Sequence, residues 1–133
     1  KELLPKEILS IFTEKYVNIA TTIKLVEVHF AQKNGGIETE LTLGREGIMK
    51  VYHGKGNGRL DAISNALKRH NVLDYKILDY KEHSLTVGSN SKACAYVQLQ
   101  LPDGRIFWGA GVHSDIIDAS ALALFSAVNR ALA

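Results

Sequence analysis

The fold is decided by the stretch Gly54–Gly58 (GKGNG) followed by Leu60–Leu67 (LDAISNAL), because a similar pattern occurs a second time in the chain. Gly109–Gly111 (GAG) followed by Ile117–Leu124 (IDASALAL) begins 55 positions later. Glycines that precede a helical period predict a strand end, a glycine turn and an amphipathic helix in each copy. Two helix N-termini at glycine turns favour a symmetric receptor for a small ligand over a single catalytic cleft.

The sequence before each of these helices predicts three strands. Alternating apolar residues bounded by turn residues mark strands at 22–30, 37–43, 48–53, 76–87, 93–101 and 105–108. Asn34-Gly35-Gly36 is typical of a hairpin turn, and the phase slip at Leu25-Val26 predicts a bulge. Three strands and one helix cannot cover both faces of a sheet. We therefore expect an α+β fold of two pseudo-twofold-related βββα units packed together, preceded by a short helix near residues 5–17.

The last helix, at 115–132, is expected to bury one apolar face. That face is formed by Ile116, Ser120, Leu124, Ala127, Val128 and Ala131.

Length and composition exclude several classes of protein. The chain has 133 residues and a net charge of +2, with no run of more than two basic residues. This size suits one domain, and the missing basic stripe argues against nucleic acid. Cys94 is the only cysteine, so no internal disulfide forms and a reducing cytoplasm is expected. No apolar run has a membrane-spanning length, and the start at Lys1 indicates a piece of a longer protein.

The glycines and the acidic residues after them each allow two interpretations. The glycines permit either close packing of strand on helix or the approach of an anion to a helix N-terminus. Asp61 and Asp118 occupy matching places in the first turn of each helix. They either complement the helix dipole or receive an ammonium group. A carboxylate at the helix start beside an aspartate for the ammonium would suit a free amino acid.

Catalytic chemistry has little support in the sequence. The five histidines show neither H-x-H nor H-x-x-x-H spacing, so no metal site is expected. A small enzyme using Asp79, Glu82 and His83 would require those side chains to be buried and clustered.

Several segments together resemble the C-terminal regulatory domain of alpha-isopropylmalate synthase, which citramalate synthases share. They are Gly56-Asn57-Gly58 with Leu60–Ala62, Leu78–Ser84 (LDYKEHS), Trp108–Val112 (WGAGV), Ala119-Ser120 and Asn129-Arg130. The resemblance covers residues 22–133. It implies a linker helix at 1–20, which joins the missing catalytic part, and a regulatory amino-acid-binding domain at 21–133. Its repeats would span about 21–71 and 75–133.

The resemblance implies a homodimer that binds L-leucine, or isoleucine, at its interface as a feedback inhibitor. This fragment would then bind and not catalyse. The divalent metal and acetyl-CoA would belong to the catalytic barrel of the parent chain, an acyl-CoA-dependent acyltransferase. No cofactor, nucleic acid or membrane is expected for this domain. By position, the effector site would comprise Gly56, Asn57, Gly58, Leu60, Asp61, Ile77, Tyr80, Ser84, Ser91, Ala93 and Ile116.

Two departures from the family pattern affect the identity of the effector. Arg59 stands where the family has proline, which adds a charge beside the expected pocket. Ser84 and Ser91 replace smaller apolar residues. One methylene group changes binding by only ~1–3 kcal/mol, so leucine and isoleucine both stay open. A purely structural dimerisation domain is the remaining alternative.

Overall fold

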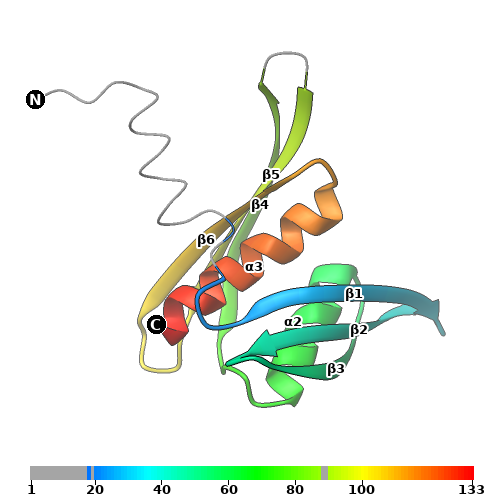
Figure 1. Ribbon diagram of the computed structural model, residues 1–133, viewed down its shortest axis with the longest axis vertical. Helices are drawn as coiled ribbons and strands as arrows, with labels where there is room; N and C mark the ends of the chain where they lie inside the picture. The colour runs from blue at the N-terminus through cyan, green and yellow to red at the C-terminus, as the bar shows by residue number, and fades with distance from the viewer. Residues whose placement is uncertain (1–17, 19, 88–89) are drawn as a thin grey trace, which may run out of the picture.

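The computed structural model describes Asn18, residues 20–87 and residues 90–133, and its elements form two βββα units. The elements are β1 (Lys24–Lys33), β2 (Gly36–Arg45), β3 (Ile48–Gly56), α2 (Arg59–Arg69), β4 (Lys76–Val87), β5 (Asn90–Gln100), β6 (Ile106–His113) and α3 (Ile116–Leu132). The strands pair antiparallel in two separate sheets, ordered β1-β2-β3 and β4-β5-β6 (Figure 1). The predicted α+β architecture is confirmed. The helix expected near residues 5–17 lies outside the described residues.

Turn chemistry sets the register of the first sheet. Asn34 and Gly35 have φ values of 48° and 78°, the positive angles that a two-residue type I′ hairpin turn requires. Glu46 and Gly47 repeat this geometry at 52° and 77°. The predicted bulge is confirmed, because the β1–β2 register shifts between Leu25 and Glu27. The first strand of the second unit has the same irregularity, between Ile77 and Asp79.

Gly54 and Gly111 lie inside strands, where they let each sheet approach its helix closely. A Cβ on Gly54 would overlap the backbone of Ala62, and a Cβ on Gly111 would overlap the backbone of Ala119. No other residue type fits such a contact without displacing the helix. Of the two interpretations of these glycines, close packing is the one that the structure bears out.

The predicted glycine turn is present before α2, at Asn57 and Gly58, but it is wrong for the second unit, as is the pairing of Gly54 with Gly109. β3 continues through Gly56, and β6 continues past Gly109 to His113. Because Gly54 and Gly111 make the same contact with their helices, the two units are offset by 57 positions. The offset of 55 that the sequence suggested for the glycines is thus two positions too small.

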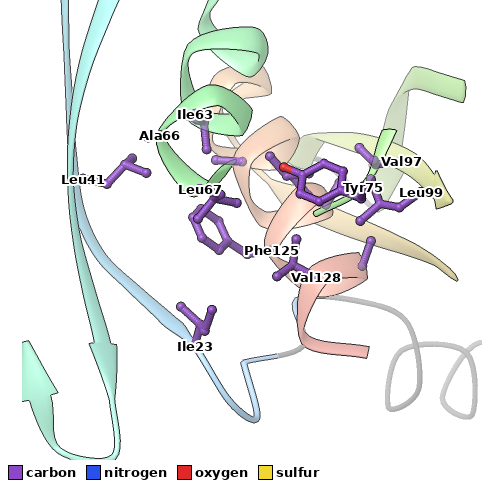
Figure 2. Packing of buried hydrophobic residues seen from close by; sticks show 14 of the residues in the cluster. Ile23, Leu41, Ile63, Ala66, Leu67, Tyr75, Val97, Leu99, Phe125 and Val128 are labelled. Carbon is purple, nitrogen blue, oxygen red and sulfur yellow. The ribbon is translucent and has the colours of Figure 1, made fainter. Parts of the chain in front are cut away.

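One hydrophobic core joins the two units. Figure 2 shows Leu41 of β2, Leu67 of α2 and Phe125 of α3 in this cluster, together with Val97 and Leu99 of β5. Leu41 and Leu67 have no exposed surface, and Phe125 is 2% exposed. Burying an aliphatic or aromatic side chain of this size contributes ~1.5–3 kcal/mol. The expectation that neither unit covers its sheet alone is confirmed.

Helix α3 is the element that connects the halves. It packs against β5 and β6 of its own sheet and also reaches α2 and β1. The prediction that α3 buries one apolar face is too narrow, because buried residues lie around much of the helix. The buried α3 residues are Ala119, Ala121, Ala123, Leu124, Phe125, Ser126, Ala127, Val128 and Asn129. Ile116 is instead 40% exposed.

Asn129 fixes the entry of β1 against α3. Its Oδ1 accepts hydrogen bonds from the backbone N–H groups of Thr22 (3.0 Å) and Ile23 (2.6 Å). Its Nδ2 donates to the Ile23 carbonyl oxygen at 2.8 Å. A buried amide that satisfies three backbone partners makes the contact between the two units directional.

No helix of the described segments is both long enough and apolar enough for a membrane span.

Candidate functional site

A pocket of about 240 Å³ lies where the two units meet, beside the first turns of both helices. Its lining residues come from α2, β4 and α3: Arg59, Leu60, Ile63, Tyr80, Glu82, Ile116 and Ser120. Drug-sized ligands occupy pockets of roughly 300–1,000 Å³. A cavity below that range, open at its rim, suits a ligand of a few heavy atoms.

The base and one wall of the pocket are apolar. Ile63 is 1% exposed and belongs to the main core, while Leu60 is half-buried against that core. Ile116 begins α3 and keeps 40% of its surface open. A ligand that covered Ile116 and Leu60 would remove apolar surface from water, at about 25 cal/mol per Å². The wall therefore fits a small branched aliphatic group.

A chain of hydroxyl groups forms the opposite wall. The Tyr80 hydroxyl is hydrogen-bonded to Ser120 Oγ, which also donates to the Ile116 carbonyl oxygen at 2.8 Å. Burial raises the pKa of Tyr80 above its ordinary value, and the nearby charge of Glu82 raises it further, against the lowering effect of the Ser120 hydrogen bond. The Tyr80 hydroxyl is thus a neutral group at physiological pH.

Two charged side chains of opposite sign also line the pocket. Arg59 occupies the first position of α2, and its Cζ lies 5.6 Å from the centroid of the Phe30 ring. Glu82 lies on β4, with Oε2 at 3.4 Å from the Tyr80 hydroxyl. Both side chains are exposed.

The turn that precedes α2 is closed by Asp61. Asp61 Oδ2 accepts a hydrogen bond from the Asn57 backbone N–H at 2.9 Å. Gly58, the N-cap residue, has extended backbone angles and makes no side-chain cap. A Cβ on Gly56 would come within 2.5 Å of that same Asp61 oxygen. This geometry favours a structural role for Asp61 over direct contact with an ammonium group.

The structure brings together three of the residues expected in the effector site: Leu60, Tyr80 and Ile116. Gly56, Asn57 and Gly58 form the approach to α2 beside them. Ile77 instead packs against the main core.

The other three expected residues lie further along the β4–β5 hairpin. Ser84 pairs with Ala93, and Ser91 pairs with Thr86. Figure 1 shows this hairpin extending well beyond the other strands. These positions are outside the described lining of the pocket.

Four lining residues were not among the expected site residues: Arg59, Ile63, Glu82 and Ser120. Arg59 had a signal, because it departs from the proline of the resembling family. Ser120 had one too, since it is a small polar residue on the expected apolar face of α3.

The arrangement required for a small enzyme is not present. Asp79, Glu82 and His83 are all exposed. Asp79 Oδ2 lies 3.8 Å from Lys81 Nζ, in an ion pair of two exposed side chains. Across residues 18, 20–87 and 90–133, no group of three or more histidine, cysteine, aspartate or glutamate side chains could hold a metal ion.

Comparison with known proteins identifies the family. The family model of the LeuA allosteric (dimerisation) domain matches residues 2–132. A 2-isopropylmalate synthase of Desulfitobacterium hafniense is 48% identical over 129 residues, which cover 97% of this chain and 23% of that protein. Proteins of the same name from Helicobacter hepaticus and Agrobacterium fabrum are 41% and 40% identical, and each match covers 98% of this chain.

The chain spans about a quarter of the length of these relatives. The match to the family model runs over nearly all of its residues, and the βββα repeats described above account for most of that length. The chain therefore belongs to the family of LeuA allosteric (dimerisation) domains, the regulatory domains of proteins named 2-isopropylmalate synthase.

Proposed function

We propose that this domain binds L-leucine in the pocket between the two units and acts as the feedback-inhibition domain of a 2-isopropylmalate synthase. The observation that carries the proposal is the pocket's combination of an aliphatic wall with hydroxyl and charged groups. An isobutyl side chain would rest on Leu60, Ile63 and Ile116. Full burial of such a group contributes ~1.5–3 kcal/mol.

The names of the relatives support leucine as the effector. A 2-isopropylmalate synthase acts in leucine biosynthesis, so leucine is the end product of its pathway. Feedback inhibition then needs a coupling free energy of ~1–3 kcal/mol between the leucine site and the catalytic part. Within this proposal, acetyl-CoA and the divalent metal are assigned to the catalytic barrel of the parent chain, and the domain itself uses no cofactor.

A dimer is part of the same proposal. The family description names dimerisation, and the first sheet carries exposed apolar side chains on the face turned away from α2. Val26, Met49 and Val51 are 45%, 66% and 49% exposed. A second copy would cover such a surface. It would also give Ser84, Ser91 and Ala93, on the projecting hairpin, a place in the effector site.

Calorimetric titration with leucine, isoleucine and valine tests the proposal. We expect saturable binding of leucine, with a lower affinity for isoleucine and valine. Leu60→Ala removes part of the aliphatic wall and should weaken binding by roughly 10-fold, since a few buried methylene groups are lost. Ile106→Ala, an exposed position on β6 outside the pocket lining, is the matched control for lost apolar surface.

Each other result has a definite meaning. Preference for isoleucine would identify the isoleucine-sensing domain of a citramalate synthase instead. Failure of all three amino acids to bind an intact dimer, verified by sedimentation, would leave a purely structural dimerisation domain.

A further inference from the structure

Arg59 and Glu82 are two opposite charges that line one pocket and do not neutralise each other. Arg59 comes from the start of α2, and Glu82 comes from β4. The ion pairs found between described residues involve neither of them. The described partner of the Arg59 guanidinium is the face of the Phe30 ring, a contact that leaves its N–H donors open.

The hydroxyl chain leaves the Glu82 carboxylate with unused acceptor capacity. Ser120 has one hydroxyl proton, and it donates that proton to the Ile116 carbonyl oxygen at 2.8 Å. The hydrogen bond between Tyr80 and Ser120 must then be donated by Tyr80. Since Tyr80 also has one proton, the 3.4 Å contact between its hydroxyl and Glu82 is at most a weak shared bond.

The pocket thus presents a cation, an anion and an aliphatic wall to the same ligand. A carboxylic acid would match only the cation and the wall, and an amine would match only the anion and the wall. A free amino acid with a short aliphatic side chain matches all three, because its charged groups sit on the same carbon atom as its side chain.

We infer that Arg59 binds the effector's carboxylate and Glu82 binds its ammonium group, so that the pocket selects a zwitterion. This inference deepens the proposed function and rests on it. It assigns specificity to two side chains that form no part of the apolar wall. It also gives the arginine at the start of α2 a role that a proline could not perform.

Two leucine analogues separate the charged ends. 4-Methylpentanoate keeps the carboxylate and lacks the amino group, while leucinamide keeps the ammonium group and lacks the carboxylate. Both are titrated into the 133-residue chain and followed by amide chemical shifts, which detect weak binding. Each should bind about 10-fold or more weakly than leucine, the effect of losing one charge-assisted hydrogen bond.

Two variants assign each end to its residue. Arg59→Gln should weaken leucine about 10-fold and leave leucinamide unchanged, since leucinamide has no carboxylate. Glu82→Gln should weaken leucine by a similar factor and leave 4-methylpentanoate unchanged. Arg69→Gln at the other end of α2 and Asp74→Asn, an exposed position before β4, change net charge equally, outside the pocket lining, and should bind leucine like the unmodified chain.

The outcomes distinguish this inference from the proposed function. If the unmodified chain binds leucine and both pocket variants bind it equally well, the inference is overturned and the proposed function stands. An Arg59→Gln variant that weakens leucinamide as much as leucine also overturns it. If the unmodified chain binds no branched-chain amino acid, the proposed function fails, and the inference fails with it. Where an analogue binds no variant measurably, the fold-changes for leucine alone decide.

Discussion

The two βββα units have the same order of elements, yet their helices differ in length and burial. α2 covers Arg59–Arg69 and buries one polar residue, Ser64, whereas α3 covers Ile116–Leu132, is buried around much of its surface and buries two polar residues, Ser126 and Asn129. With the offset of 57 positions, the last turns of α3 have no counterpart in α2. Those turns carry Asn129, which binds the start of β1. One helix therefore covers its own sheet, and the other joins both units.

The largest expected effect comes from a methyl group added at the glycine that supports α3. Gly111→Ala places a Cβ against the backbone of Ala119, and α3 cannot retreat because β1 and α2 pack on its other sides. Overpacking a core of this kind costs about 3 kcal/mol or more. Gly54→Ala should cost less, since α2 has an exposed face and can shift outward. Urea unfolding of both variants measures the difference.

Gly58→Ala is the control for these two glycines. A Cβ there meets open space, and its φ of −142° suits any residue. An equal loss of stability in Gly54→Ala and Gly111→Ala would refute the distinction between the two helices.

The second effect concerns the contact that only α3 makes. Asn129→Ala leaves the Thr22 and Ile23 backbone groups without their partner in a buried place, which should cost about 2–3 kcal/mol. The Thr22 and Ile23 amides should also exchange faster with solvent. Asn65→Ala on α2 removes one hydrogen bond, to the exposed Lys55 carbonyl oxygen, and should cost less than 1 kcal/mol. Comparable losses for the two asparagines would contradict the asymmetry.

The third effect lies at the junction between the units. Tyr75 and Ser64 share a buried hydrogen bond of 2.8 Å, and burial raises the pKa of Tyr75 to about 12. An unfolded tyrosine loses its proton near pH 10, so between pH 10 and about 12 the unfolded chain binds fewer protons than the folded one. Stability should therefore fall as pH rises through this window, by about 1–3 kcal/mol.

Tyr75→Phe isolates that contribution. The variant should lose about 1 kcal/mol at neutral pH, because Ser64 is left without its partner. It should then lose less stability than the unmodified chain between pH 10 and 12, as followed by circular dichroism. Equal alkaline losses in both proteins would assign the effect to other groups.

The smallest expected effect is at the start of α2. Arg59 holds the first helical position, where proline is well suited because its fixed φ matches a helix and no N–H is needed. Arg59→Pro should change stability by no more than about 0.5–1 kcal/mol, in the stabilising direction. Under the inference above, it should still weaken leucine binding as Arg59→Gln does. A proline variant that binds leucine normally would remove Arg59 from the site.

The sequence predicts the strands and turns well because their signals are local. Asn34-Gly35 requires positive φ values whatever surrounds it, and the slip at Leu25-Val26 can be seen in the alternation itself. Local sequence does not determine which contact each glycine makes with its helix. Gly109 and Gly111 both face α3, and packing alone decides that Gly111, not Gly109, lies against the Ala119 turn.

The site could be predicted only in part for the same reason. Leu60, Tyr80 and Ile116 were expected from the resemblance, and they meet in one pocket. Glu82 and Ser120 lie 38 positions apart, and they line one pocket because α3 packs on the sheet to which β4 belongs. A charged residue on an exposed strand gives no sign in the sequence of facing a cavity. Burial of α3 around most of its surface was hidden too, since alanine and serine mark no single face.

The two asparagines that hold the N-terminal part of the chain determine how a mechanical load would pass through the domain. Asn18 binds β6 through its backbone N–H to Ala110 and its side chain to Val112, and Asn129 of α3 holds Thr22 and Ile23. A pull or a rotation arriving from residues before Asn18 is therefore resisted by the second unit before it reaches β1 of the first. The second unit therefore bears the load first, and the first unit is not strained until the hydrogen bonds of Asn18 and Asn129 break.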